Sequence, residues 1–158
     1  MTNTLEMKLS IIPAADAIAK YFEYYPSDIL TKVRLTHRGP FYIYSFLGND
    51  GKSRHLLKLN AQNGGIIKNK TKTLRGKRRD PIRREMKKLN LEGILSLTEA
   101  NDVALKTVPD ATPVKWKLER KKGRTLWKIK LIGQSVANMH KVKIDAQNGS
   151  LIQVKLKH

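Results

Sequence analysis

The sequence predicts an α+β protein of two repeats, each with one helix packed on an antiparallel sheet of three to four strands. The tetrapeptide Ala-Gln-Asn-Gly at residues 61–64 recurs at residues 146–149. Each copy follows an Ala-containing segment with helical periodicity and several segments in which apolar and polar residues alternate. Helical periodicity indicates an amphipathic helix, and strict alternation indicates half-buried strands.

One offset aligns the two copies without a gap, placing residues 12–68 over residues 97–153. His55 falls on His140 at this offset, which suggests a structural role for both. Three segments follow from the alignment. Residues 1–68 form the first repeat, residues 69–95 a basic and partly helical linker, and residues 96–158 the second repeat.

A helix opens each repeat. In the first, Pro13 suits the first turn of a helix over residues 14–25, and Pro26 ends it. In the second, Thr98 is the expected cap of a helix over residues 98–108.

Four strands follow each helix, because apolar and polar residues alternate there. The predicted strands cover residues 29–35, 41–47, 54–60, 66–68, 114–120, 125–132, 140–145 and 151–157. Each helix is expected to cover one face of its sheet. The pattern leaves open whether the two sheets are continuous.

The linker is strongly basic, with ten Lys and Arg against three acidic residues. We predict a short amphipathic helix over residues 82–91, in which Ile82, Met86 and Leu89 share one stripe. Positive charge is concentrated here and in the second repeat. The three segments carry +4, +7 and +8 of the total +19.

A net charge of +19 and a pI near 10.3 favour a polyanionic partner: nucleic acid, anionic lipid headgroups, wall polymers or an acidic protein. The absence of cysteine excludes disulfides and thiol catalysis. No apolar run is long enough to span a membrane. The first ten residues lack the apolar core of a signal peptide, so either the protein stays in the cell or a leader has been removed.

Aromatic residues of the strands are expected in the core, because they alternate in phase with aliphatic ones. They are Trp116, Trp127, Tyr42, Tyr44 and Phe46. A base-stacking platform is the less favoured interpretation.

Lysines alternate with the apolar residues in all four strands of the second repeat. If the apolar side chains face the helix, the lysines face away. Eight lysines then share one open face: Lys115, Lys117, Lys128, Lys130, Lys141, Lys143, Lys155 and Lys157. Like charges that lie opposite one another destabilise a sheet, so we favour a polyanion-binding surface over a solvated face that merely resists aggregation.

Six linker residues complete the predicted polyanion-binding site: Arg75, Lys77, Arg78, Arg79, Arg83 and Arg84. The corresponding outward positions of the first repeat are more apolar and include Phe41, Ile43, Leu47 and Leu56. That face is expected to be covered by the second repeat, by the linker helix or by a partner protein.

The strand and turn at residues 142–152 (Val-Lys-Ile-Asp-Ala-Gln-Asn-Gly-Ser-Leu-Ile) resemble the PepSY family, whose signature is an apolar strand running into Asp-Ala-x-Thr/Asn-Gly. The first repeat departs from it, because Asn60 stands where Asp145 stands in the second. Exchange of a carboxylate for an amide favours a turn over a metal or catalytic site. The resemblance implies a non-catalytic domain of protease propeptides and exported bacterial proteins, which binds or restrains proteases or acts in the cell envelope.

These observations predict a non-enzymatic, exported module, extracellular or in the cell wall, that binds anionic wall polymers through its basic surface. We expect no metal and no cofactor, since neither HExxH nor a phosphate-cradling glycine loop occurs. The first alternative is a module that inhibits or regulates a protease. The second is an intracellular nucleic-acid-binding protein, which the excess of lysine over arginine on the sheet disfavours. The oligomeric state stays open.

Overall fold

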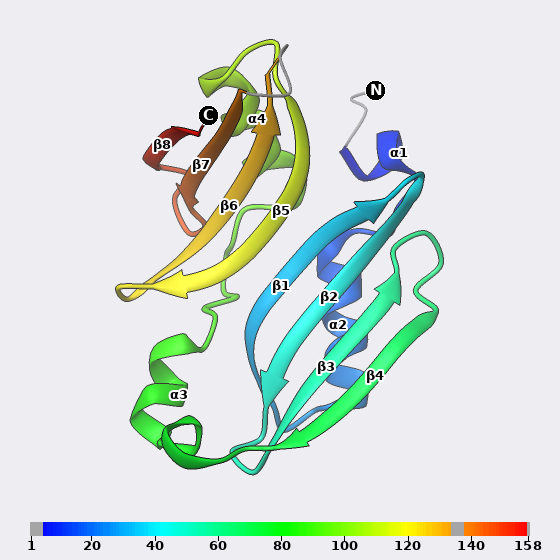
Figure 1. Ribbon diagram of the computed structural model, residues 1–158, viewed down its shortest axis with the longest axis vertical. Helices are drawn as coiled ribbons and strands as arrows, with labels where there is room; N and C mark the ends of the chain where they lie inside the picture. The colour runs from blue at the N-terminus through cyan, green and yellow to red at the C-terminus, as the bar shows by residue number, and fades with distance from the viewer. Residues whose placement is uncertain (1–4, 134–137, 158) are drawn as a thin grey trace.

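The chain folds around one antiparallel sheet of eight strands in a computed structural model that describes residues 5–133 and 138–157. The strand order is β4-β3-β2-β1-β5-β6-β7-β8 (Figure 1). The strands are β1 (Ile29–Arg38), β2 (Phe41–Asn49), β3 (Ser53–Asn60), β4 (Ile66–Thr73), β5 (Thr112–Lys121), β6 (Arg124–Ile132), β7 (Met139–Asp145) and β8 (Leu151–Lys157). The helices are α1 (Leu5–Leu9), α2 (Ala14–Tyr24), the 3-10 helix η1 (Gly76–Arg79), α3 (Pro81–Lys87) and α4 (Leu97–Thr107).

The pairing of β1 with β5 makes the sheet continuous, which answers the question that the sequence left open. Val33 lies opposite Leu118, and Leu35 lies opposite Trp116. All four side chains are at most 2% exposed. The joint between the two halves of the sheet is therefore part of the hydrophobic core.

The helices α2 and α4 cover the same face of the sheet, behind the strands in Figure 1. As the alternation predicts, the strand aromatics Trp116, Trp127, Tyr44 and Phe46 are buried, while Tyr42 is half-buried. Both indole N–H groups find acceptors in this core. Trp116 Nε1 donates to Asn101 Oδ1 at 2.9 Å, and Trp127 Nε1 donates to the Leu95 carbonyl at 3.0 Å. These bonds satisfy polar groups that would be costly to bury unpaired.

The cap of α4 corrects one prediction. Ser96, not Thr98, begins the helix, and it forms a capping box in which its side chain and that of Glu99 each accept from the other residue's backbone N–H. Thr98 instead donates to Glu6 Oε2 at 2.6 Å and accepts from the backbone N–H of Leu5 at 3.0 Å. It thereby holds α1, a helix that the sequence did not predict, against α4.

The linker helix is also shorter than predicted. It ends at Lys87, and the backbone N–H of Leu89 donates to the Leu30 carbonyl of β1 at 2.9 Å. Leu89 is 4% exposed and belongs to the core, whereas Ile82 and Met86 are 73% and 65% exposed. The predicted stripe therefore does not form. The helix ends after about two turns, and the chain then bonds to β1 through Leu89.

The two Ala-Gln-Asn-Gly segments form the same turn. Asn60 Oδ1 accepts from the backbone N–H of Gln62 at 2.9 Å, and Asp145 Oδ1 accepts from that of Gln147 at 2.8 Å. Gly64 and Gly149 follow with φ of 74° and 78°, a conformation that favours glycine. An amide and a carboxylate accept the same bond here, as the exchange of Asn60 for Asp145 predicts.

We therefore expect Asp145→Asn to change the free energy of unfolding by less than about 0.5 kcal/mol. Asp145→Ala should lower it by about 1 kcal/mol, because the turn loses a hydrogen-bond acceptor. Urea unfolding of both variants checks this. Equal losses in both would mean that the carboxylate charge, and not the turn, is what matters at this position.

Candidate polyanion-binding surface

The lysines of β5–β8 lie on the sheet face opposite the helices, as predicted. We call Lys115, Lys117, Lys128, Lys130, Lys141, Lys143 and Lys155 the lysine face. They form two rows across the strands. In one, Lys117 lies opposite Lys128, which lies opposite Lys143. The other row runs through Lys115, Lys130, Lys141 and Lys155.

The side chain of Lys157, the eighth predicted lysine, lies outside the described part of the chain. Six of the remaining seven are half-buried, and Lys155 is exposed. The side chains of Lys117 and Lys128 are only 22% and 20% exposed. Their aliphatic stems therefore pack side by side on the sheet with the ammonium groups outward. A shallow depression of about 350 Å³ is lined by the lysine face together with Ile129 and Gln153.

Burial and neighbouring positive charges lower the pKa of two of these ammonium groups, those of Lys115 and Lys143. Burial lowers the pKa of Lys115, and the positive charges of Arg34 and Lys117 lower it further. Burial and the charge of Lys128 likewise lower the pKa of Lys143. At these two positions the charged form is disfavoured, and the negative charge of a bound polyanion would favour it.

One carboxylate, Glu119 of β5, lies among these lysines and was missed by the sequence analysis. It forms ion pairs with Lys117 at 3.3 Å, with Lys121 at 3.7 Å and with Lys128. Burial raises its pKa, but the bonds and charges of Lys128 and Lys117 outweigh burial and hold the pKa at about 2. Glu119 has the same parity along β5 as Lys115 and Lys117, and this pattern could have placed it on the same face of the sheet.

The linker is fixed at both ends, and hydrogen bonds of α3 join it to the sheet between them. Leu74 is 5% exposed and donates its backbone N–H to the Lys52 carbonyl at 2.8 Å, and Leu89 is buried at the other end. Arg84 Nε donates to Asn49 Oδ1 at 2.6 Å. Arg120 Nη1 donates to the carbonyls of Glu85 and Lys88, at 3.1 and 3.2 Å. These bonds satisfy carbonyls at the end of α3.

Between the linker and the sheet lies a cavity of about 690 Å³, which we call the linker cleft. Among the charged residues that line it, Glu119 is the one acidic residue and the others are basic. The basic residues are Lys32, Arg54, Arg75, Lys77, Arg78, Arg83, Arg84, Lys87, Arg120 and Lys121. Of the strand residues among them, Lys32, Arg54 and Lys121 lie on the same face as the lysines, and Glu119, which lines the cleft, also pairs with Lys117 and Lys128. The linker cleft and the lysine face therefore adjoin.

Of the six predicted linker residues, only Arg79 does not line this cleft. The sequence did not indicate the other basic residues of the cleft, which are Lys87 and the sheet residues that face the linker: Lys32, Arg54, Arg120 and Lys121. Their position depends on where the linker crosses the sheet, and no local pattern encodes that crossing. Arg84 is half-buried, and the other five predicted residues are exposed.

The apolar outward positions of the first half are only partly covered. Leu47 lines the linker cleft, and Ile43 and Leu56 are half-buried. Phe41 is 58% exposed. The second half does not cover this face, because it continues the sheet edge to edge through β1 and β5.

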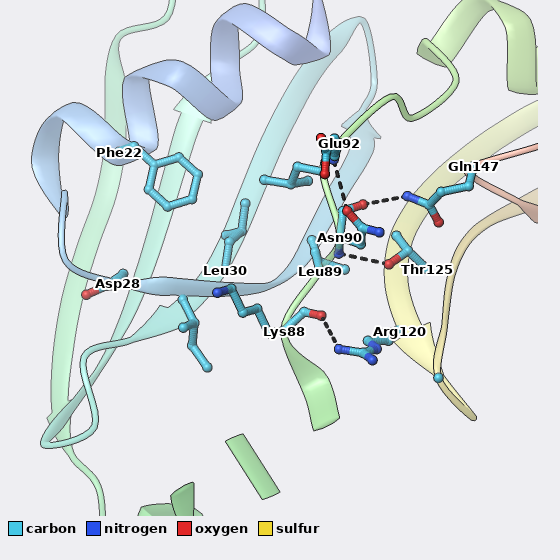
Figure 2. Close-up of a pocket in the computed structure, with 13 residues that line it drawn as sticks. Phe22, Asp28, Leu30, Lys88, Leu89, Asn90, Glu92, Arg120, Thr125 and Gln147 are labelled. Atoms are coloured by element: carbon cyan, nitrogen blue, oxygen red, sulfur yellow. Dashed lines mark hydrogen bonds between the residues drawn. The ribbon is translucent and has the colours of Figure 1, made fainter. Parts of the chain in front are cut away.

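A second cavity, of about 550 Å³, lies on the other side of the linker (Figure 2). Figure 2 shows how the chain is held there. Asn90 donates its backbone N–H to Thr125 Oγ1 at 2.9 Å and accepts at its carbonyl from Gln147 Nε2 at 2.8 Å. These contacts fix the linker between the halves of the sheet. The lining of the cavity includes two carboxylates, Asp28 and Glu92. Among the described lining residues, no nucleophilic side chain is paired with a general base, as a hydrolytic active site would require.

A buried polar network surrounds His55. Asp28 Oδ2 accepts from the Tyr21 hydroxyl at 2.6 Å and lies 2.7 Å from His55 Nδ1. Tyr25 stacks on the imidazole with ring centroids 3.9 Å apart. Donor atoms of Asp28, Asp50 and His55 lie within 4.8 Å of one another. Because two partners already occupy the Asp28 oxygen, the arrangement fits the structural role expected for His55.

Comparison with known proteins agrees with this fold. Residues 94–155 match the PepSY family, described as peptidase propeptide and YPEB domain. This match spans α4 and β5–β8. The crystal structure of a "putative lipoprotein" from Clostridium difficile 630 superimposes with a TM-score of 0.88, at 22% sequence identity, over 99% of this chain and 100% of that one. A search of curated proteins found no relative. None of the described helices is long and apolar enough to cross a membrane.

Glu119 provides a test of the charge balance on this surface. Its pKa of about 2 lies below the ordinary value of 4.5, so its carboxylate stabilises the fold above about pH 4.5, and this contribution is lost as the pH falls through about 2. We expect Glu119→Gln to lower the free energy of unfolding at pH 7 by about 1–2 kcal/mol. The difference between variant and wild type should shrink between pH 4.5 and 2 in urea unfolding. A difference that does not change with pH would contradict the assigned ion pairs.

Proposed function

We propose that this protein is an exported, non-enzymatic PepSY-type module, extracellular or in the cell wall, that binds anionic polymers of the cell envelope. The observation that supports this most is the union of the lysine face and the linker cleft on one side of the sheet. Across both, Glu119 is the one carboxylate among the described lining residues. A surface that only had to be soluble would not need to concentrate one sign of charge in this way.

The geometry suits a flexible chain of phosphates. The rows of lysines present ammonium groups at strand spacing, and the half-buried stems restrict their motion before binding. The linker cleft adds arginines, which form bidentate bonds with phosphate. Binding would release condensed counterions and would weaken steeply with salt.

We also propose that the chain is a duplicated PepSY domain, with repeats at residues 1–68 and 96–158 and a linker at residues 69–95. The family match covers the second of these. Support for the first comes from the equivalent turns at Asn60 and Asp145 and from the equal number of strands around each helix.

Envelope location draws support from the description of the structural neighbour as a "putative lipoprotein". The description of the matched family, peptidase propeptide, favours a second candidate function, the regulation of a protease. In that case the basic surface would steer the encounter with an acidic enzyme. Inhibition of a metalloprotease by the purified protein would then be expected at a salt concentration that abolishes polymer binding.

The proposal predicts binding to teichoic acid that depends on both parts of the surface. Changing Lys130, Lys143 and Lys155 to Gln should make the binding constant less dependent on salt. The magnitude of the negative slope of log K against log salt should fall by up to about one for each phosphate group that the variant no longer neutralises. Changing Lys77, Arg78 and Arg83 to Gln should have an effect of similar size. Neither set should reduce stability, because both relieve repulsion.

The matched control changes Lys8, Lys20 and Lys106 to Gln, which removes the same charge from the helical side. Fluorescence titration over a salt series should leave this variant close to wild type. Random-sequence duplex DNA is titrated in parallel. Tighter binding of DNA than of teichoic acid would support an intracellular nucleic-acid-binding protein instead. Equal weakening by all three sets would show that only net charge matters and would overturn the proposed site.

A further inference from the structure

The sheet ends in two edge strands of different character. β4 pairs only with β3 and β8 only with β7 among the strands of residues 5–133 and 138–157. The free side of an edge strand presents backbone N–H and C=O groups that another strand can bond. β8 is seven residues long and contains no proline, so it is a ready template for a further strand.

β8 exposes apolar side chains on the helix side of the sheet. Val154 lies opposite the buried Val142, and Leu156 lies opposite His140. Yet Leu151, Val154 and Leu156 are 47%, 43% and 47% exposed. They extend the core face beyond the part that α4 covers, which leaves an apolar strip along the edge.

The opposite edge, β4, has only a shorter strip, although it occupies the equivalent place in the other half: Ile66 and Ile67 are 47% and 52% exposed, but polar residues follow them. At the offset that aligns the two turns, Asn69 and Thr71 of β4 stand where Val154 and Leu156 stand in β8. Asn69 also accepts a hydrogen bond from the Tyr25 hydroxyl, so this side of β4 is partly covered. Polar residues at such positions discourage pairing with other strands. Of the two edge strands, β8 therefore has the longer apolar face, because its strip continues through Val154 and Leu156.

The other face of β8 is basic. Lys155 is exposed and lies opposite Lys141, and Gln153 lies opposite Lys143. A second copy of this chain paired through β8 would bring lysines opposite lysines on a continuous face, which is unfavourable. A strand with acidic residues at those positions would pair with them.

We propose that β8 binds an extended segment of a partner protein in which acidic and apolar residues alternate, added to the sheet as a ninth strand. Backbone bonds would supply affinity. The alternation would place acidic side chains beside Lys155 on the lysine face and apolar ones against Val154 and Leu156 on the other. This inference does not rest on polymer binding, since it uses one strand and no part of the linker.

The test uses a fluorescein-labelled peptide as long as β8, in which Glu and Val alternate. A second peptide of the same composition, with all Val before all Glu, keeps the charge and loses the alternation. Fluorescence anisotropy should detect binding of the alternating peptide only, at a salt concentration that abolishes polymer binding. Amide hydrogen exchange of β8 should slow when it is bound.

Two variants locate the site. Changing Val154 to Asn and Leu156 to Thr gives β8 the residues of β4, and it should weaken binding by a factor of up to about five for each residue. Lys155→Glu should shift the preference to a peptide of alternating Lys and Val. The control Lys70→Glu, at the equivalent position of β4, should leave binding unchanged. Circular dichroism checks that each variant folds.

Equal binding of the two Glu-Val peptides, or no slowing of exchange in β8, would overturn the proposal. So would sedimentation of the free protein as a dimer with β8 protected from exchange, because the edge would then belong to a second copy. Loss of teichoic acid binding in the linker variant with unchanged peptide binding would separate the two proposals.

Discussion

The pairing of β1 with β5 is the interaction on which the rest of the structure depends. It joins two four-stranded halves through four residue pairs, and it buries Val33 and Leu118 against each other. On the opposite face the same register places Arg34 beside Lys117 and Lys32 beside Glu119. The register that completes the core therefore also sets the basic side chains in line, because successive side chains of a strand point to opposite faces.

That alignment has an electrostatic cost, which the protein offsets only in part. Glu119 pairs with three lysines, of which Lys117 and Lys128 belong to one row of the lysine face, and the charge of Lys117 still lowers the pKa of Lys115 in the other row. Half-burial of the lysine stems contributes packing and at the same time lowers the pKa of Lys115 and Lys143. A partner that supplies negative charge would stabilise the fold to the extent that it binds the native state more tightly than the unfolded chain.

Local patterns predicted α2, α4 and the eight strands because helical periodicity and alternation are local properties, whereas they placed the cap of α4 at Thr98 instead of Ser96. They predicted the lysine face for the same reason, since the parity of Lys128 or Lys143 along its strand decides its side. Contacts between distant segments were not predictable. No local pattern predicts that β1 pairs with β5 or that the backbone of Leu89 bonds to Leu30. The same holds for Arg120 and Lys32, which line the linker cleft. The predicted linker helix extended beyond the end of α3, because tertiary contacts override the local preference for helix.

The central claim is that polyanions bind the open side of the sheet and not the helical side. A titration of the ¹⁵N-labelled protein with a short teichoic acid fragment, followed by amide and lysine NMR shifts, tests it directly. We expect the perturbed signals to lie in β5–β8 and in the linker, with Lys130 and Arg83 among them. Perturbations concentrated on α2 and α4, or spread evenly over every exposed lysine, would contradict the claim.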